Sequence, residues 1–330
     1  KVMLDKKSRL ILSGGNRRDV EQLGGSLTSS NDILGRSLLS GTPLTLSSNN
    51  TLTNINLSSL ALQIEPLYNF NIRLEGTYRT LVGADTDLFS LAFFTDEART
   101  QTQEQTTQTE LTFTANYTPN KKATGFGVEQ YVVNAGKYPE FMLKYSKGIK
   151  GLINSDFDYN RLQMLYRQPI LMGGFGQFTS TLEAGKTFDA VPLGLLNVVP
   201  GNETLFSIEG TFPLLDYYEF VTDEYVSLHM EHNFNGRLFA RIPFLRDLDL
   251  REIVTFRGVY GKLSEESSLL NASTSNPVLF APDRNIYYSY SFGIGNIFRV
   301  FRLDFHFRGN YFDIQDSRSF GITGAFGFYF

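Results

Sequence analysis

The sequence contains no cysteine, no tryptophan and only three histidines among its 330 residues. Without cysteine the chain has no disulfide, no thiolate metal site and no cysteine nucleophile. No run of about 18 apolar residues occurs, which excludes an ordinary transmembrane helix. The net charge of −4 gives no reason to expect a nucleic-acid partner. No signal-peptide pattern follows Lys1, so we expect a mature chain or a fragment of one.

Recognisable catalytic motifs are also missing from the sequence. His229 and His232 are three residues apart and would lie on opposite faces of a strand, so they do not form a local metal pair. His306 follows Asp304 on one face; with a serine this could suggest a hydrolase, but we favour ion pairing inside a barrel. No zinc-binding histidine pair, P-loop or nucleophile elbow is present. We therefore expect no catalytic centre, no metal and no cofactor.

Phenylalanine and tyrosine are abundant, with 29 and 17 copies, although the mean hydropathy is only −0.17. Strands of a transmembrane barrel combine these properties, because outward apolar residues alternate with inward polar residues. A soluble all-β protein with a phenylalanine-rich core is the alternative interpretation. The absence of tryptophan counts mildly against a membrane barrel.

The last twelve residues, 319–330, have the clearest period of two. Small or polar residues fill most of the odd positions, which indicates a strand with one bulky apolar face. We expect the even positions to face lipid: Phe320, Ile322, Gly324, Phe326, Phe328 and Phe330. The glycines of this strand weaken pairing or mark a bend, so we expect a poorly paired seam that involves Gly321, Gly324, Gly327 and Phe330. The alternative is that the glycines only make room for side chains inside the barrel.

The preceding strand, 301–310, has phenylalanine and leucine on one face and polar residues on the other. A water-filled barrel interior lets unlike charges on the polar face pair with one another. We expect an interior polar network made of Arg302, Asp304, His306 and Arg308 with His229 and Glu231.

Similar alternation predicts about twelve strands, many close to the roughly 9–11 residues that cross a bilayer at a tilt. The predicted strands are 8–14, 55–65, 69–80, 107–118, 139–146, 157–167, 177–187, 222–234, 250–262, 286–295, 301–310 and 319–330. Counted back from the C-terminus, most long connections fall on the outer side of the membrane, as barrels require. The exceptions are 119–138 and 235–249, and a further strand at 124–133 would break the alternation of sides. Residues 30–39 have the spacing of a short helix.

Several segments together resemble a group of Bacteroidota outer-membrane proteins that carry a carboxypeptidase-regulatory-like domain ahead of a barrel. They are RRDVEQLGG (17–25), KYPEFMLKYSKGIKGL (137–152), LEAGKTFDAVPLGLLNVVPGNETLF (182–206), the stretch 217–261, GIGNIFRVFRLDFHFRGNYF (293–312) and FGITGAFGFYF (320–330). The barrels of this group resemble the BamA/TamA superfamily, which assembles or exports outer-membrane proteins.

The resemblance implies a 16-stranded barrel with a weak seam between its first and last strands. This chain would then be its C-terminal part, without the first strands and the periplasmic domain. The superfamily's long sixth outer loop carries a Val-Arg-Gly-Phe-type motif that reaches into the interior. The corresponding loop here, 188–221, has Val199, Pro200, Gly201 and Asn202, and this motif contains no arginine.

The sequence therefore predicts an antiparallel transmembrane β-barrel in the outer membrane of a Gram-negative bacterium. The resemblance implies a part in outer-membrane protein assembly or export. Alternation alone supports a passive channel or a structural scaffold equally well. The partners we expect are outer-membrane lipid and other outer-membrane or periplasmic proteins.

Overall fold

A computed structural model describes residues 1–5, 9–23, 27, 51–124, 131–133, 135–271, 279–314 and 316–326. Among these residues no helix is both long enough and apolar enough to cross a membrane. The helix predicted at 30–39 lies outside the described residues.

One antiparallel sheet of 13 strands dominates the fold, and its strands follow one another in the sheet in the same order as in the chain. Its strands are β1 (Val2–Asp5), β2 (Leu10–Glu21), β3 (Thr53–Leu67), β4 (Phe70–Gly83), β7 (Thr106–Tyr117), β10 (Glu140–Gly148), β11 (Tyr159–Leu171), β12 (Gln177–Thr187), β15 (Glu224–Asn233), β16 (Arg251–Lys262), β17 (Tyr287–Ile297), β18 (Phe301–Arg308) and β19 (Phe320–Phe326). All twelve predicted segments form strands, which confirms the all-β, antiparallel barrel class. Sequence analysis missed β1, whose four residues are too few to display alternation.

The remaining elements are short and lie in the connections. Three pairs of two-residue strands form separate small sheets: β5 (Phe93–Phe94) with β6 (Thr102–Gln103), β8 (Ala123–Thr124) with β9 (Tyr131–Val132), and β13 (Asn197–Val198) with β14 (Val221–Thr222). The helices are α1 (Pro243–Arg246), α2 (Glu265–Leu270) and the 3-10 turns η2 (Ala135–Lys137), η3 (Leu152–Asn154), η4 (Gly173–Phe175), η5 (Leu193–Leu195) and η6 (Phe239–Arg241). β8 and β9 pair with each other, so neither adds a strand to the main sheet.

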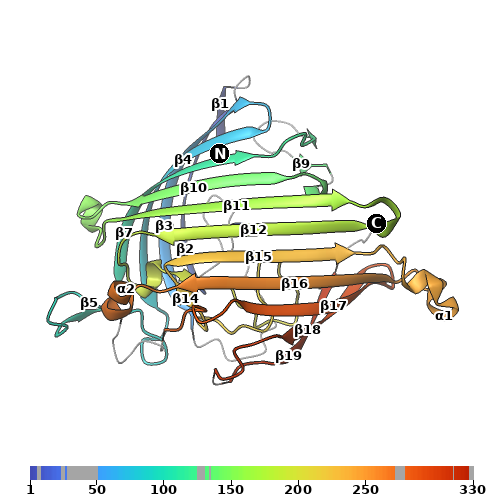
Figure 1. The fold of residues 1–330 in the computed structure, drawn as a ribbon. Coiled ribbons are helices and arrows are strands. Elements are labelled where there is room, and N and C mark those ends of the chain that lie inside the picture. Colours follow the sequence, from blue (N-terminus) through green and yellow to red (C-terminus); the bar gives the residue numbers. More distant parts are fainter. Residues whose placement is uncertain are drawn as a thin grey trace.

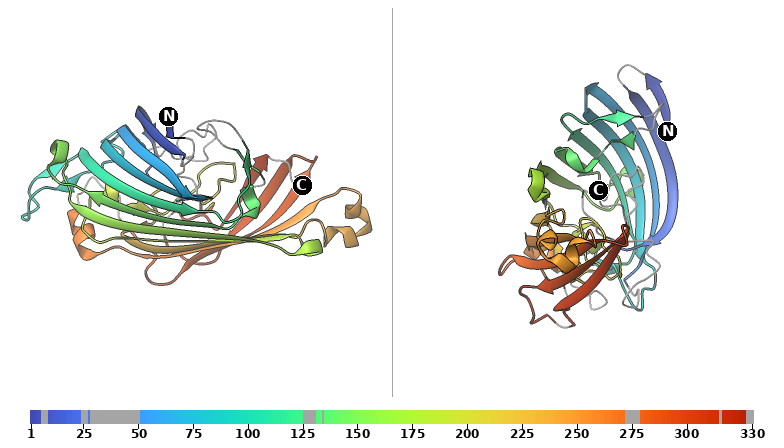
Figure 2. Two further views of the ribbon diagram at one scale, coloured as in Figure 1. Left: turned by 90° about the horizontal axis from the view of Figure 1, so that it is seen from above. Right: turned by 90° about the vertical axis from the view of Figure 1, so that its right-hand side faces the viewer.

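The sheet curves into an open trough, with β1 at one edge and β19 at the other (Figures 1 and 2). In the described part of the chain, no strand joins these two edges. Long connections, with β5 and α2, gather at one end of the strands, whereas α1 lies at the other (Figure 1). The long connection 235–249 therefore lies on the side of the short turns, as predicted by counting the connections back from the C-terminus.

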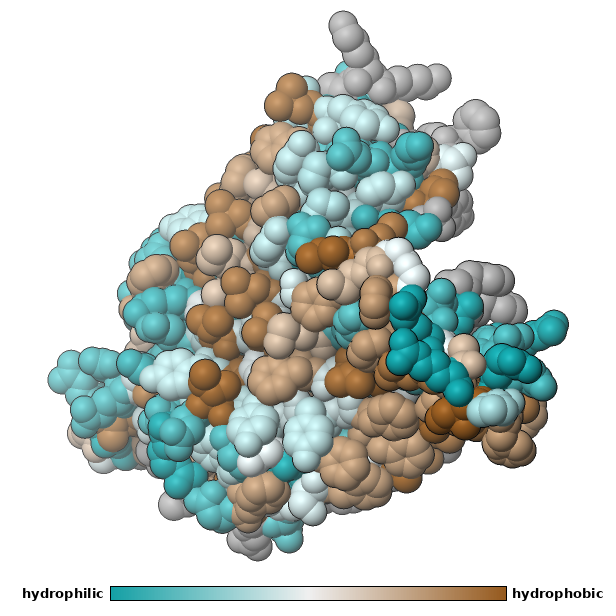
Figure 3. Space-filling model, turned by 45° about the vertical axis from the view of Figure 1, so that its right-hand side comes forward, coloured by the Kyte–Doolittle hydropathy of each residue, from teal (hydrophilic) through white to brown (hydrophobic). Residues whose placement is uncertain are grey.

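Side chains alternate between the outer, convex face of the sheet and its inner, concave face. In β7, Leu111 and Phe113 are 44% and 38% exposed, whereas their neighbour Thr112 is only 4% exposed. The same alternation turns Phe320, Ile322 and Phe326 of β19 outward, as predicted, while Phe328 and Phe330 lie outside the described residues. Apolar side chains gather over the strands in Figure 3, and hydrophilic side chains gather toward both ends of the strands.

Aromatic rings form a row across the outer face near the short turns. Ring centroids are 6.3 Å apart for Phe70 and Tyr117, 6.4 Å for Tyr117 and Phe141, and 4.7 Å for Phe141 and Tyr166. These four residues belong to four successive strands of the sheet, from β4 to β11. We call them the aromatic row.

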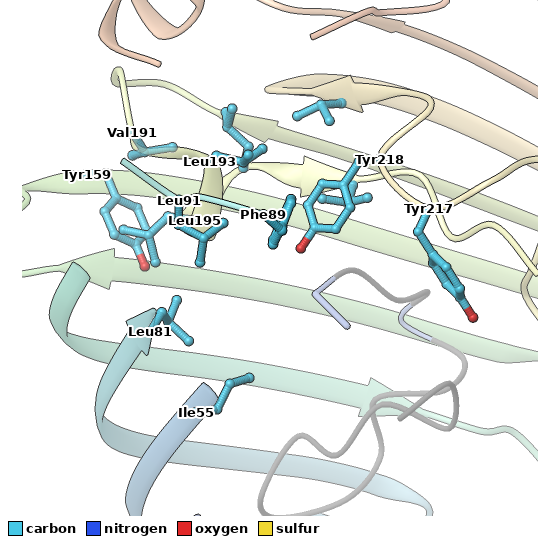
Figure 4. Packing of buried hydrophobic residues seen from close by; sticks show 13 residues of the cluster. Ile55, Leu81, Phe89, Leu91, Tyr159, Val191, Leu193, Leu195, Tyr217 and Tyr218 are labelled. Carbon is cyan, nitrogen blue, oxygen red and sulfur yellow. The ribbon is translucent and has the colours of Figure 1, made fainter. Parts of the chain in front are cut away.

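Loops pack against much of the concave side of the sheet. The largest contribution comes from residues 188–223, the connection from β12 to β15, which we call the plug. We call the 13-stranded sheet the wall. The plug residues Leu193, Leu195, Tyr218 and Val221 pack with Ile55 and Leu81 of the wall and with Phe89 and Leu91 of another loop (Figure 4). A second cluster joins the plug residues Val199, Phe212, Leu215 and Phe220 to Val259, Tyr287 and Tyr311. The plug therefore carries the main hydrophobic core of the described structure.

We predict that Leu193→Ala lowers the free energy of unfolding by about 2–5 kcal/mol, because the surrounding side chains do not collapse fully into the cavity. Leu193 is 0% exposed, whereas Leu88, in an outer loop, is 63% exposed. The control Leu88→Ala should change the same free energy by less than about 0.5 kcal/mol. Urea unfolding in detergent solution gives both values. Equal losses in the two variants would contradict a packed plug.

Candidate functional site: the plug and the edge of the last strand

The motif predicted in the sixth loop lies at the centre of the plug. The amide of Val199 donates to Phe220 O at 2.9 Å, and Phe212 donates to Pro200 O at 2.8 Å. Gly201 lies so close to the carbonyl oxygens of Leu215 and Asp216 that a β-carbon would stand 2.5 and 2.7 Å from them. Any larger residue at position 201 would therefore separate the two halves of the plug.

Asn202 completes this motif and organises the turn that follows it. Its side-chain amide donates to Phe206 O at 2.7 Å, and its side-chain oxygen accepts from the amide and hydroxyl of Thr204 at 2.9 and 2.8 Å. Asn202 is 0% exposed. These bonds fix the direction in which residues 205–207 leave the plug.

An arginine from a different loop reaches the same motif. Arg318, just before β19, donates to Asn202 O at 3.2 Å and to Leu215 O at 2.9 Å, and pairs with Asp216 at 2.9 Å. The loop motif itself has no arginine, so the guanidinium at this place comes from more than 100 positions further along the chain. Sequence analysis did not identify Arg318, because no local pattern connects it to the plug.

Three of the six residues predicted to form an interior polar network lie together. Arg302 pairs with Glu231 at 2.8 Å and with Asp304 at 2.8 Å. Asp304 is 1% exposed, which places its carboxylate deep on the inner face. Next to them lies a cavity of about 330 Å³ between the wall and the plug, whose lining includes Arg167, Glu183, His229, Glu231, Arg257 and Arg302.

The other three residues of the predicted network have separate partners. His306 bonds to the Thr323 hydroxyl at 2.8 Å, and His229 packs edge-on against the Phe212 ring of the plug at 4.8 Å. Arg308 pairs with Glu219 of the plug at 2.6 Å. The side chains of Arg308 and Glu219 are 0% and 6% exposed, so this ion pair is shielded from water.

Metal and catalytic groups were expected to be absent. Within the described ranges, no three histidine, aspartate or glutamate side chains come together in a way that could hold a metal ion. His229 and His232 have different surroundings: His229 faces the plug, whereas His232 stacks on Phe234 at 4.1 Å near the turns.

The edge of β19 that faces away from β18 is held by the plug at one point. The Gly324 amide donates to Leu205 O at 2.7 Å, and the Ser207 amide donates to Gly324 O at 2.8 Å. These two bonds form a parallel bridge between Phe206 and Gly324. The centroid of the Phe206 ring lies 6.2 Å from that of the Phe326 ring, so side chains also meet at this edge. In the described residues this contact takes the place where a neighbouring strand would pair.

A poorly paired seam was predicted for this strand. Toward β18 the strand is regularly paired from Phe320 to Phe326, so Gly321 and Gly324 do not disturb that ladder. Gly321 makes room for Leu214 of the plug, 2.9 Å from the position of a β-carbon, which fits the alternative reading of the glycines. Gly324 lies under the Phe301 ring at 2.9 Å and forms the bridge to the plug. Gly327 and Phe330 lie outside the described residues.

The strand predicted at residues 8–14 is not the edge of the sheet. β1 covers part of it, because Val2 pairs with Leu12 and Met3 with Ile11.

We predict that Glu219→Ala destabilises the chain by about 3–5 kcal/mol, because it leaves Arg308 buried without its carboxylate. Asp313→Ala is the matched control. It breaks the ion pair with Arg284, in which both side chains are about 60% exposed, and should cost less than about 1 kcal/mol.

The absence of cysteine permits a direct readout of the plug. A single thiol from Val198→Cys replaces a side chain that is 1% exposed. Maleimide should label this thiol faster in the Glu219→Ala background than in the Asp313→Ala background. Equal labelling rates would mean that the ion pair does not hold the plug in place.

Comparison with known proteins adds a family and a distant structural likeness. No curated protein matches the sequence. Among 31 matching chains of solved structures is CdiB from Acinetobacter baumannii, with 8% sequence identity and a TM-score of 0.39. The match covers 84% of this chain but only 50% of CdiB, so the chain spans about half the length of that structure. A TM-score this low carries no argument about activity.

The sequence match is more informative. Residues 60–266, from β3 to the start of α2, match a family described as the C-terminal domain of a family of unknown function, DUF5686. These residues include most of the wall and the whole plug. Since the match covers more than half of the sequence, the chain belongs to the DUF5686 C-terminal domain family.

Proposed function

We propose that this protein is a β-barrel component of the outer membrane of a Gram-negative bacterium and that it acts in the assembly or export of outer-membrane proteins. The proposal includes no catalytic centre, no cofactor and no nucleic-acid partner. Its partners are outer-membrane lipid and other outer-membrane or periplasmic proteins.

The membrane part of the proposal is supported by the two faces of the sheet. Large apolar side chains are exposed along the outer face, many inward residues are polar, and the aromatic row crosses the outer face near the short turns. Membrane barrels have this arrangement, because lipid solvates the apolar band while aromatic rings prefer the interface with water. A soluble protein would have to cover this face with another layer.

The observation that carries the assembly part is the bridge between the plug and Gly324. Unpaired backbone groups at a strand edge in lipid cost several kcal/mol each, so an edge needs a partner. Here the described partner is a short loop segment joined by two hydrogen bonds rather than a full strand. An edge that is held at one point can exchange this loop for an extended segment of another chain. The resemblance of the sequence to the BamA/TamA superfamily supports the same interpretation.

A passive channel or a scaffold is the second candidate, favoured by the polar cavity beside Arg302 and Arg257. Against a steady pore stands the plug, whose residues Leu193, Leu214 and Leu215 are fully buried in the concavity. A channel of this design would conduct only after the plug moves.

We predict that Met164→Arg, on the outer face of β11, destabilises the protein in lipid vesicles by about 2–4 kcal/mol, as lipid-facing charges do in membrane barrels. Met164 is 52% exposed, and on a surface that faces water the same change should cost less than about 0.5 kcal/mol. Leu88→Arg, in an outer loop, is the control. A small effect of Met164→Arg in vesicles would contradict the membrane placement.

The assembly role predicts that depletion of the protein lowers the levels of other outer-membrane proteins, measured by proteomics of isolated outer membranes. Unchanged levels, together with a steady conductance in planar bilayers, would favour the channel instead.

The bridge to Gly324 can be tested in the same depletion strain. Ser207→Pro removes the amide that donates to Gly324 O, at a cost of about 0.5–1.5 kcal/mol. Ser207→Ala keeps this amide and is the matched control. We expect the proline variant, and not the alanine variant, to speed hydrogen exchange at Gly324 and to change how well the depletion is complemented. Identical behaviour of the two variants would separate the bridge from the function.

A further inference from the structure

The connection between β15 and β16 is longer than a hairpin requires. Residues 235–249, which we call the foot, include η6 and α1, whereas hairpins on this side of a barrel are joined by short turns. Figure 1 shows α1 projecting beyond the ends of the strands, away from the long loops. The foot is folded rather than extended: Ala240 donates to Gly236 O at 2.8 Å and Arg246 donates to Ile242 O at 3.0 Å.

The foot exposes large apolar side chains instead of covering them. Leu238 is 45% exposed, Ile242 47%, Phe244 81% and Leu248 51%. Phe298, in the adjacent turn between β17 and β18, is 91% exposed. Apolar patches of this kind mark surfaces that contact a membrane or a partner protein.

The foot is continuous with the apolar outer face of the sheet. The Phe239 ring lies 6.4 Å from that of Phe292, an outward residue of β17 that is 40% exposed. The Arg237 guanidinium stacks over the Phe175 ring at 3.9 Å and donates to Gly174 O at 3.2 Å. The Phe239 amide donates to the Glu252 carboxylate, which anchors the foot to β16. The apolar outer face of the strands therefore touches the foot at the Phe239 and Phe292 rings.

Arginines are interleaved with the apolar residues of the foot. Arg237, Arg241 and Arg246 alternate with leucine, isoleucine and phenylalanine. Arg241 and Arg246 are exposed, and Arg246 lies 3.5 Å from the exposed carboxylate of Asp247. Segments that lie in a membrane interface combine bulky apolar residues with basic residues in this way, because the former enter the acyl boundary while the latter remain among the phosphates.

We propose that the foot binds the lipid bilayer itself, lying in the headgroup region of the leaflet next to the short turns. Phe244, Ile242, Leu238 and Leu248 enter the boundary with the acyl chains, and Arg241 and Arg246 contact lipid phosphates. This inference rests on the proposed membrane location and adds a specific lipid-binding segment to it. Lipid is favoured over a protein partner because the foot continues the surface that the strands present to lipid.

The absence of tryptophan allows single reporters to test the proposal on the full chain. Phe244→Trp reports on the foot, Phe113→Trp on the middle of β7, and Leu88→Trp on an outer loop. All three positions are exposed, so the substitutions leave the core intact. Each variant is reconstituted into vesicles of phosphatidylcholine and phosphatidylglycerol that carry bromine either near the headgroup or deep in the acyl chain.

For Phe113→Trp, the bromine position that quenches more strongly sets the reference. We expect bromine near the headgroup to quench Phe244→Trp by at least half of that reference value. Bromine deep in the acyl chain should quench Phe113→Trp more than Phe244→Trp. Neither bromine position should quench Leu88→Trp. Replacing phosphatidylglycerol with phosphatidylcholine should reduce the quenching of Phe244→Trp. This dependence on phosphatidylglycerol should become smaller when Arg241→Gln and Arg246→Gln are present, because these arginines carry the attraction to anionic lipid.

Two outcomes would overturn the proposal, and they are distinguishable. If Phe113→Trp is quenched but Phe244→Trp behaves like Leu88→Trp, the barrel lies in lipid and the foot does not, which leaves the foot to a protein partner. If neither Phe113→Trp nor Phe244→Trp is quenched, the proposed membrane location fails as well.

Discussion

The water-shielded ion pair between Arg308 and Glu219 is the interaction on which the interior of this protein depends. Arg308 also donates to Leu214 O at 3.3 Å and to Tyr311 O at 2.9 Å, so one guanidinium joins β18, the plug and the loop before β19. A buried arginine has a high desolvation cost, which only a carboxylate and several carbonyl oxygens can offset. The plug supplies the carboxylate and one of the three carbonyls that accept from Arg308, the other two being those of Asn310 and Tyr311. Removing the plug would take away the carboxylate that pairs with Arg308.

This dependence follows from the two-residue period of the strands. A wall that is apolar outside is polar inside, and polar groups away from bulk water need partners. Arg302 finds Glu231 and Asp304 on the wall itself, while Arg167 and Arg308 find Glu209 and Glu219 on the plug. The hydrophobic clusters then fill the remaining space between the loops. The interior is therefore built by charge pairing with the wall and by apolar packing within and around the plug.

The strands could be predicted from the sequence because alternation is local. For residues such as Leu111, Phe113 and Phe320, the alternation with their immediate neighbours indicates which face of the sheet the side chain occupies. β1 escaped prediction because four residues carry too little pattern, and its place is set by pairing with Leu10–Leu12. The polar face of β18 was recognised as inward, and the pairing of Arg302 with Asp304 could be anticipated because the two residues are two apart on that face.

The partners from distant segments could not be predicted. Arg308 and Glu219 are 89 positions apart, and Arg318 and Asn202 are 116 apart. Sequence periodicity carries no information about which loop enters the concavity or which carbonyl it presents. The motif Val199–Asn202 was identified only through a resemblance, and its role in shaping the plug became visible through close contacts such as that of Gly201 with Leu215.

The path of the plug through the molecule has a mechanical consequence. Both of its ends are fixed to β12 and β15, neighbours in the middle of the sheet, while its tip bonds to the outermost strand. A force that pulls β19 away from its position is therefore transmitted through residues 205–207 to the centre of the wall. The edge strand β19 and the plug are therefore mechanically coupled, so β19 cannot move away from its position unless the plug moves as well.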